Sequence, residues 1–121
     1  TASVQISEAA QVSDPHVVKV VVDRFGHALY FSRAPIPYLR DPDKAFEHQL
    51  YRHIGLYAYR CGYLAEFTQL EPCMLEHVEA LEQLRVLWHG GKIRVLQTDD
   101  EPGHGVDTPA DLQRVREFFK K

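Results

Sequence analysis

Two apolar runs separated by a short turn signal constrain the fold of this chain most strongly. Residues 17–22 read Val-Val-Lys-Val-Val-Val, and a second apolar run covers residues 27–31. Between them stands Asp23-Arg24-Phe25-Gly26, a composition typical of a turn. The pattern predicts a β-hairpin with a four-residue connection. Pro35 and Pro37 follow, and because proline donates no backbone hydrogen bond, we expect the chain to leave the sheet there.

The remainder of the chain interleaves strands and helices. Alternating or apolar runs predict further strands over residues 53–59 and 92–98, and helical spacing predicts helices over 62–70, 74–89 and 108–120. The longest helix would end at Gly90-Gly91, a typical glycine cap. Residues 38–49 are charged and without periodicity, which predicts a mobile surface loop. The sequence therefore indicates an α/β protein with a mixed sheet and flanking helices.

Composition excludes several classes of protein. The chain has 121 residues, of which 45% are hydrophobic and 26% charged, as expected of one ordinary globular domain. Its net charge of −3, without a block of Lys or Arg, argues against a nucleic-acid partner. It has no apolar stretch of the roughly 18 residues that a membrane span requires. Two cysteines make no disulfide framework and no leader segment is apparent, so we expect a reducing, cytoplasmic location.

The predicted strand around Gly55 is the first place where chemistry can sit. His53 and Tyr57 would lie on one face of this strand, on either side of the glycine. Glycine inside a strand often marks the close approach of a ligand or of another backbone. The alternative interpretation is a bulge beside a core histidine.

Two charged residues fall on or near the apolar face of the predicted long helix. Met74, Val78, Leu81 and Trp88 would share one apolar arc, with Arg85 inside it and Glu82 at its edge. Because Glu82 and Arg85 are three residues apart, they can form an ion pair. Buried charge is costly unless it is paired or used, so this pair is a candidate functional feature. Alternatively, Arg85 reaches past the apolar face into solvent.

Asp107 and two arginines are the remaining candidates. Asp107 ends a glycine-containing loop directly before a predicted helix for which Thr108 already supplies the cap, so its carboxylate is available as a metal ligand. It can equally be a solvated turn residue favoured by the helix dipole. Arg33 and Arg40 bracket the proline turn, and arginine's planar fork suits a carboxylate.

Five segments carry a resemblance to a known family: Val-Lys-Val-Val-Val-Asp (18–23), Ala-Leu-Tyr-Phe-Ser-Arg-Ala-Pro-Ile-Pro (28–37), Arg-His-Ile-Gly-Leu-Tyr (52–57), Leu-Glu-His-Val-Glu-Ala-Leu-Glu-Gln-Leu-Arg-Val-Leu (75–87) and Pro-Gly-His-Gly-Val-Asp-Thr-Pro (102–109). In this order they closely resemble 3-deoxy-manno-octulosonate cytidylyltransferase, the CMP-Kdo synthetase of Gram-negative bacteria. The resemblance covers nearly the whole chain. Cys73 departs from the serine cap that is usual before Leu75-Glu76, and His104 from the commoner threonine.

The resemblance implies the C-terminal half of a nucleotide-diphospho-sugar transferase-like, Rossmann-like fold. Residues 1–121 would form one segment that binds the sugar acid and dimerises, whereas the CTP-binding half is absent. It also implies a cytoplasmic homodimer that transfers a cytidylyl group from CTP to 3-deoxy-manno-octulosonate (Kdo) for lipopolysaccharide biosynthesis, with Mg²⁺ as cofactor. We expect the chain alone to be inactive, because it lacks the phosphate-binding loop.

The resemblance assigns roles residue by residue. His53, Tyr57, Glu82 and Gln83 would contact the sugar, with Arg33 and Arg40 near its carboxylate and Asp107 as a magnesium ligand. Gln83 is implied by the family alone. Two alternatives remain open: a cytidylyltransferase for another acidic sugar, such as an N-acylneuraminate, and a non-catalytic binding or dimerisation module.

Overall fold

A computed structural model describes residues 1–41, 49–100, 106 and 109–120 of the chain. The strands are β1 (Ala2–Gln5), β2 (Lys19–Val22), β3 (Ala28–Ser32), β4 (Tyr51–Ile54) and β5 (Leu96–Thr98). The helices are α1 (Ala9–Ser13), α2 (Cys61–Phe67), α3 (Met74–Glu79), α4 (Leu84–Trp88) and α5 (Pro109–Phe118).

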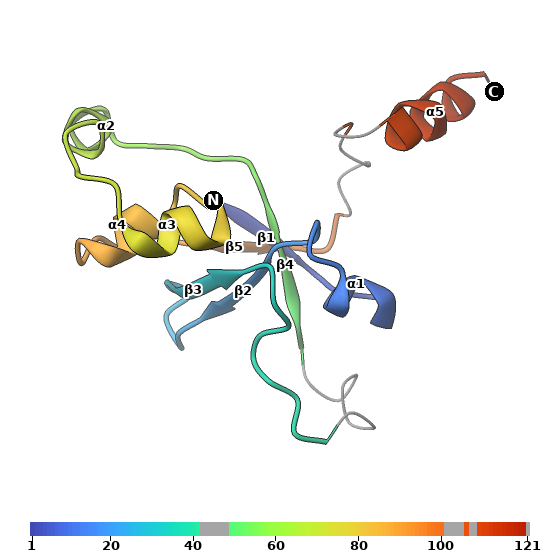
Figure 1. Cartoon of the computed structure of the whole chain (residues 1–121), viewed down its shortest axis with the longest axis horizontal. Coiled ribbons are helices and arrows are strands. Elements are labelled where there is room, and N and C mark those ends of the chain that lie inside the picture. Colours follow the sequence, from blue (N-terminus) through green and yellow to red (C-terminus); the bar gives the residue numbers. More distant parts are fainter. Residues whose placement is uncertain (42–48, 101–105, 107–108, 121) are drawn as a thin grey trace.

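The strands form one mixed sheet in the order β3-β2-β4-β1-β5. β1 pairs antiparallel with β4, where Ala2 lies opposite Ile54, and parallel with β5, where Ala2 lies opposite Leu96. Helices α2, α3 and α4 gather at the β3 end of the molecule, and α5 lies apart from the sheet (Figure 1). The predicted fold class, a mixed sheet with flanking helices, is confirmed.

The predicted hairpin is confirmed as β2 and β3. The Asp23 carboxylate accepts hydrogen bonds from the backbone N–H groups of Phe25 (2.8 Å) and His27 (2.9 Å), which fixes the turn. Gly26 has a φ of +77°, a conformation that favours glycine. β3 ends at Ser32, before the two prolines, as the sequence predicts.

The core lies between the hairpin and the helices that follow the sheet. Val20 and Phe31 from the hairpin pack in one buried cluster with Leu84 and Val86 of α4. Lys19 is also fully buried, and its ammonium donates to the carbonyl oxygens of Asp14, Val17 and Arg33 at 2.8, 2.6 and 2.5 Å. Burial lowers the pKa of Lys19, but the three oxygens replace its hydration shell. The buried lysine therefore ties the segment before β2 to the end of β3.

The predicted strand over 53–59 is wrong beyond Ile54. β4 covers Tyr51–Ile54, and the N–H of Leu56 donates to the carbonyl of Ile54 at 2.7 Å, so the backbone turns at Gly55. A Cβ atom added at Gly55 would have no neighbour within 4 Å among the described residues. The glycine therefore marks a turn, and no other backbone lies close to it there. Residues 55–60 instead form an irregular segment that connects the sheet to α2.

The predicted single helix over 74–89 is also wrong. Ala80 adopts a left-handed conformation (φ +51°) and splits the segment into α3 and α4. The N–H groups of Ala80 and Leu81 both donate to the carbonyl of Glu76, which closes α3. The predicted apolar arc fails with it, because Val78 is 74% exposed and Met74 and Trp88 are exposed as well.

The other elements differ less from their predictions. The helix over 62–70 is present as α2, and the helix over 108–120 as α5, which begins at Pro109. The strand over 92–98 narrows to β5, preceded by an isolated bridge between His27 and Arg94. Cys73 precedes α3 without a side-chain cap. The sequence did not predict β1 or α1, and most of the predicted mobile loop, together with His104, lies outside the described residues.

Candidate functional site

A cavity of about 540 Å³ opens between the irregular 55–60 segment and the helices that follow it. The cavity draws its walls from the chain start, the hairpin turn, the 55–60 segment, α2, α4 and the approach to β5. Its lining residues are Thr1, His27, Tyr57, Ala58, Tyr59, Arg60, Tyr63, Gln83, Val86, Lys92, Ile93, Arg94 and Leu96. Two predicted site residues, Tyr57 and Gln83, are among them.

Tyr57 places an unused polar group at this cavity. Its hydroxyl oxygen is buried without a well-formed hydrogen bond, although it lies close enough to Thr1 for that residue to lower the pKa of Tyr57 slightly. Burial raises the pKa of Tyr57, and the nearby Glu82 carboxylate raises it further, so the phenol stays neutral. A neutral buried hydroxyl can both donate and accept, and a ligand in the cavity could satisfy it.

His53 lies behind Tyr57 and does not line the cavity. The two ring centroids are 5.4 Å apart, and His53 Nε2 is 2.8 Å from the hydroxyl oxygen of Thr1. Burial lowers the pKa of His53 to about 4, with a smaller contribution from the Thr1 ammonium group. The imidazole is therefore neutral near pH 7. It packs against the Tyr57 ring while its own Nε2 is hydrogen-bonded to Thr1.

Glu82 and Gln83 point in different directions although they are neighbours. Gln83 is 3% exposed and lines the cavity, whereas Glu82 is exposed. The Glu82 charge raises the pKa of both Tyr57 and Tyr59, which places its carboxylate near the same wall. The predicted pair between Glu82 and Arg85 is wrong. Arg85 instead forms a two-pronged pair with Glu76, because the break at Ala80 turns α4 back toward α3.

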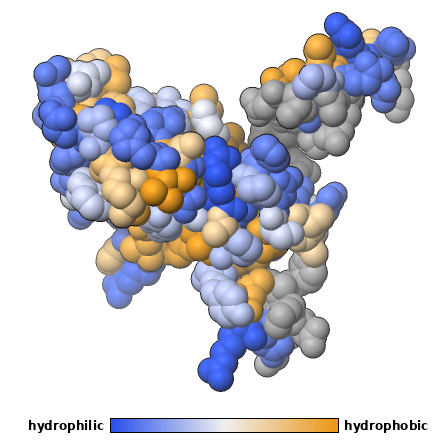
Figure 2. All heavy atoms as spheres, viewed as in Figure 1, coloured by the Kyte–Doolittle hydropathy of each residue, from blue (hydrophilic) through white to orange (hydrophobic). Residues whose placement is uncertain are grey.

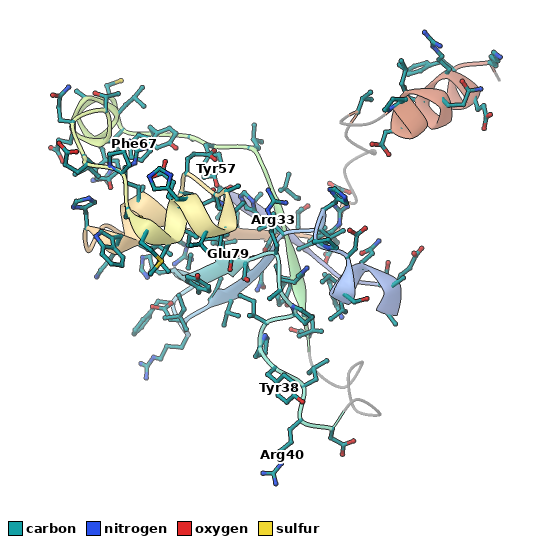
Figure 3. The ribbon with its side chains drawn as sticks, in the orientation of Figure 1. Arg33, Tyr38, Arg40, Tyr57, Phe67 and Glu79 are labelled. Carbon is teal, nitrogen blue, oxygen red and sulfur yellow. The ribbon has the colours of Figure 1, made fainter. Side chains whose placement is uncertain are left out.

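The structure does not bring Arg33 and Arg40 to the cavity. The guanidinium of Arg33 donates to the carbonyl oxygens of Glu79 (2.8 Å), Pro15 (2.9 Å) and Ala80 (3.4 Å). These hydrogen bonds connect backbone segments and occupy the donors that a substrate carboxylate would need. Arg40 lies far from Arg33, at the end of the segment that leaves the sheet (Figure 3). Its exposed side chain points away from the rest of the molecule.

Basic side chains that the sequence analysis missed line the same cavity. They are Arg60, Lys92 and Arg94. Arg94 donates to the carbonyl of Phe25, but within the part of the chain that the structure describes, the exposed side chains of Arg60 and Lys92 have neither a hydrogen-bond nor an ion-pair partner. Their spacing in the sequence, more than thirty residues apart, carries no signal that could have grouped them. Two unpaired cations beside polar tyrosine and glutamine suit a polar ligand with a negative charge.

The predicted metal ligand cannot be placed in this arrangement. Asp107 lies outside the described residues. Among the residues that are described, no three His, Cys, Asp or Glu side chains come together as a metal site. Within the same residues, no helix is both long and apolar enough to cross a membrane.

Comparison with known proteins decides the family. A family model described as cytidylyltransferase matches residues 1–93. The chain belongs to this cytidylyltransferase family. Its first strand, its hairpin and its candidate cavity up to Ile93 all fall within the matched part.

Individual relatives agree with this assignment. The chain is 51% identical over 121 residues to the 3-deoxy-manno-octulosonate cytidylyltransferase of Polynucleobacter necessarius, covering all of this chain and 48% of the relative. It is 52% identical over 120 residues to the enzyme of that name from Vibrio cholerae, covering 96% of this chain and 48% of the relative. The chain thus spans about half the length of the curated relatives it matches and corresponds to their C-terminal half.

A solved structure extends the likeness to three dimensions. It is described as CMP:2-keto-3-deoxy-manno-octonic acid synthetase complexed with CTP, and it matches with a TM-score of 0.88 at 43% identity. The match covers 99% of this chain and 48% of that one. The family resemblance and the nucleotide-sugar transferase-like fold predicted from the sequence are therefore confirmed.

Proposed function

We propose that this chain is the sugar-acid-binding half of an enzyme that transfers a cytidylyl group from CTP to Kdo. One observation carries the proposal. The cavity joins an unpartnered tyrosine hydroxyl and a buried glutamine to two unpaired basic side chains, in a chain that is 51% identical over its whole length to a 3-deoxy-manno-octulosonate cytidylyltransferase. Kdo carries both hydroxyl groups and a carboxylate, so this cavity offers a partner to each kind of group.

The proposed reaction is a displacement at phosphorus. The anomeric hydroxyl oxygen of Kdo attacks the α-phosphorus of CTP and loses its proton to solvent, an O–P bond forms, and the bond to pyrophosphate breaks, so that pyrophosphate leaves. Such a step needs little covalent help from the protein, and its rate depends on alignment and on neutralised charge. The part of this chain is to hold the sugar so that its anomeric hydroxyl faces the nucleotide.

The cavity residues divide this task by their chemistry. The Tyr57 hydroxyl and the Gln83 amide hydrogen-bond to sugar hydroxyl groups. Glu82 does not line the cavity, but its carboxylate raises the pKa of Tyr57 from nearby and would accept from a sugar hydroxyl that extends beyond the cavity. Arg60 and Lys92 draw the sugar carboxylate by charge. In this assignment they take the role that the resemblance gave to Arg33 and Arg40, whose side chains lie elsewhere.

Mg²⁺ belongs to the proposal as a cofactor, with Asp107 as one of its ligands. When bound, it would neutralise the phosphate oxygens of CTP. A carboxylate is the ligand type that this cation prefers, and Asp107 stands in one of the segments that carry the family resemblance.

A test of the proposal needs the full-length protein that contains this chain. Purified protein should release pyrophosphate from CTP when Kdo is added, and much less with N-acetylneuraminate. The 121-residue chain alone should release none, because it spans only half the length of its relatives. Faster pyrophosphate release with N-acetylneuraminate than with Kdo would show that Kdo is not the preferred substrate. Absence of turnover with every sugar acid would favour the binding or dimerisation module.

We also propose a homodimer and a cytoplasmic location. Met74 and Val78 are exposed on α3, and Figure 2 shows an apolar patch over this helix. Such a patch suits a partner surface, and light scattering that finds a monomer at micromolar concentration would contradict the dimer. The cytoplasm supplies CTP, and free Cys61 and Cys73 agree with a reducing compartment.

A further inference from the structure

Five aromatic rings form a continuous row from the core, past the cavity, to the end of α2. We call this row, made of Phe31, His53, Tyr57, Tyr59 and Phe67, the aromatic ladder. Successive ring centroids are 5.0, 5.4, 5.9 and 6.1 Å apart. Each spacing lies in the range of favourable ring contacts. The third and fourth rings, Tyr57 and Tyr59, both line the cavity.

The ladder matters because the 55–60 segment has little else to hold it. These residues belong to no strand or helix. Their described backbone hydrogen bonds are few: Leu56 N–H donates to the Ile54 carbonyl, Thr1 Oγ1 donates to the Leu56 carbonyl, and the Arg60 carbonyl accepts from Leu64 N–H. The orientation of Tyr57 and Tyr59 therefore depends on the rings at the two ends of the ladder.

The inner end of the ladder is fixed by the core. Phe31 is fully buried on β3, and its ring meets His53 edge-to-face at an interplanar angle of 75°. His53 belongs to β4, which is paired on both sides, with β1 and with β2. This end can move only with the sheet.

The outer end is held by an ion pair. The Arg85 guanidinium lies 5.3 Å from the centre of the Phe67 ring. It donates to the Glu76 carboxylate through Nε (2.8 Å) and Nη2 (2.5 Å), and through Nη1 to the Leu70 carbonyl (3.3 Å). Both charged side chains are mostly shielded, with 19% and 14% of their areas exposed. One guanidinium therefore links α3, α4 and the end of α2, and Figure 3 shows Phe67 and Tyr57 on the same side of α3 and α4.

We propose that Arg85 and Glu76 are positioning residues, which set Tyr59 and Tyr57 through Phe67 and thereby shape the sugar-acid cavity. Neither residue lines the cavity. A loosened pair would release Phe67 and let the 55–60 segment shift, which would weaken sugar binding and leave the nucleotide half of the enzyme unaffected. The inference rests on the proposed function.

The experiment uses full-length protein with Arg85→Lys, which keeps the charge but loses the planar fork. We expect the KM for Kdo to rise about 3- to 30-fold while the KM for CTP stays at its wild-type value. Arg24→Lys is the matched control, because Arg24 also lies over a phenylalanine ring, Phe25, at 4.6 Å, but outside the cavity. It should change neither KM.

A spectroscopic measurement separates positioning from general stability. With fluorotyrosine incorporated, the Tyr57 fluorine resonance, assigned with Tyr57→Phe, should shift in Arg85→Lys but not in Arg24→Lys. Phe67→Leu removes the last ring of the ladder and leaves the ion pair intact. It should produce the same shift and the same rise in the KM for Kdo. This second variant tests the inference where Arg85→Lys fails to fold.

The outcomes remain distinguishable. A folded Arg85→Lys or Phe67→Leu protein with unchanged KM for Kdo and an unmoved Tyr57 resonance would overturn the inference. Wild-type protein without Kdo turnover would instead refute the proposed function, and the Tyr57 resonance would still decide whether the ion pair orients the ring.

Discussion

The ring of Tyr57 packs against the ring of His53 at a centroid distance of 5.4 Å and an interplanar angle of 57°. This contact joins a residue of a paired strand to a residue of an irregular segment. It buries the imidazole in its neutral form and leaves the tyrosine hydroxyl without a described partner. A residue of the sheet thus supports a tyrosine ring that lines the cavity.

Tyr57→Phe separates ligand binding from stability. The change removes a buried, unpartnered hydroxyl, so the free energy of unfolding should stay the same or rise by up to about 1 kcal/mol. The KM for Kdo should rise roughly tenfold, the equivalent of one lost hydrogen bond. Tyr51→Phe is the control, because the Tyr51 hydroxyl bonds to Gln49 and does not line the cavity. Equal effects of the two changes on the KM would contradict the assignment.

His53 predicts how stability depends on pH. Burial lowers its pKa to about 4, compared with 6.5 when it is exposed, so below pH 6.5 the unfolded state binds a proton that the folded state does not. His53 should therefore lower stability as pH falls from about 6.5 to 4, by at most about 3 kcal/mol in total. In denaturant titrations of the full-length protein, His53→Asn should reduce this slope. The same change at exposed His16 should leave the slope as in the wild type, and identical slopes for both variants would show the prediction to be wrong.

Arg33→Lys tests a structural role against a substrate role. The Arg33 guanidinium holds three backbone carbonyl groups, and a lysine can reach only part of them, so the free energy of unfolding should fall by about 1–3 kcal/mol. Arg40→Lys, at an exposed side chain, should change it by less than about 0.5 kcal/mol. Chemical denaturation measures both. A large rise in the KM for Kdo without loss of stability in Arg33→Lys would restore the substrate role.

The left-handed residue between α3 and α4 offers a stabilising change. Ala80 has a φ of +51°, where a side chain is unfavourable, so Ala80→Gly should raise the free energy of unfolding by up to about 1 kcal/mol. Ala65→Gly, inside α2, should lower it by about 0.5–1 kcal/mol. Thermal or chemical denaturation measures the free energy of unfolding of both variants, and the two changes should have opposite signs. Destabilisation by both changes would mean that α3 and α4 form one helix in solution.

Asp107→Asn tests the proposed magnesium ligand. Asparagine keeps the size of the side chain but removes its charge, so turnover at limiting Mg²⁺ should fall about 100- to 1000-fold. We expect stability to change by less than about 1 kcal/mol. The assay titrates Mg²⁺ against full-length wild type and variant, with thermal melting in parallel. Turnover within a few-fold of the wild type would show that Asp107 is not a ligand.

The sequence predicted the parts of the fold that depend on neighbouring residues. The β2–β3 hairpin, its Asp23–Gly26 turn and helix α2 follow from local composition and spacing. His53 and Tyr57 were also predicted to lie together, and they do, although Tyr57 is not in a strand. The predicted strand ended early because no strand pairing continues beyond Ile54, and pairing cannot be read from alternation alone.

Tertiary contacts decided the rest. No glycine or proline marks Ala80 as a break, and the contacts that accompany the break, the burial of Leu84 and the pairing of Arg85 with Glu76, are tertiary. The basic residues at the cavity come from segments distant in the sequence, and β1 acquires its neighbours only when β4 and β5 are in place. No local pattern contains that information.

The placement of β1 bears on how the chain folds. The first strand lies between β4 and β5, which come from the middle and the later part of the sequence, while the hairpin pairs within itself. Pairings between strands so far apart in the sequence form slowly, because the entropy of closing the long intervening loop is lost before the stabilising contacts form. The hairpin should thus form early and the β1–β5 pairing late. During synthesis the pairing of β1 with β4 and β5 cannot form until those later strands have left the ribosome, and until then the backbone groups of β1 remain open to mispairing.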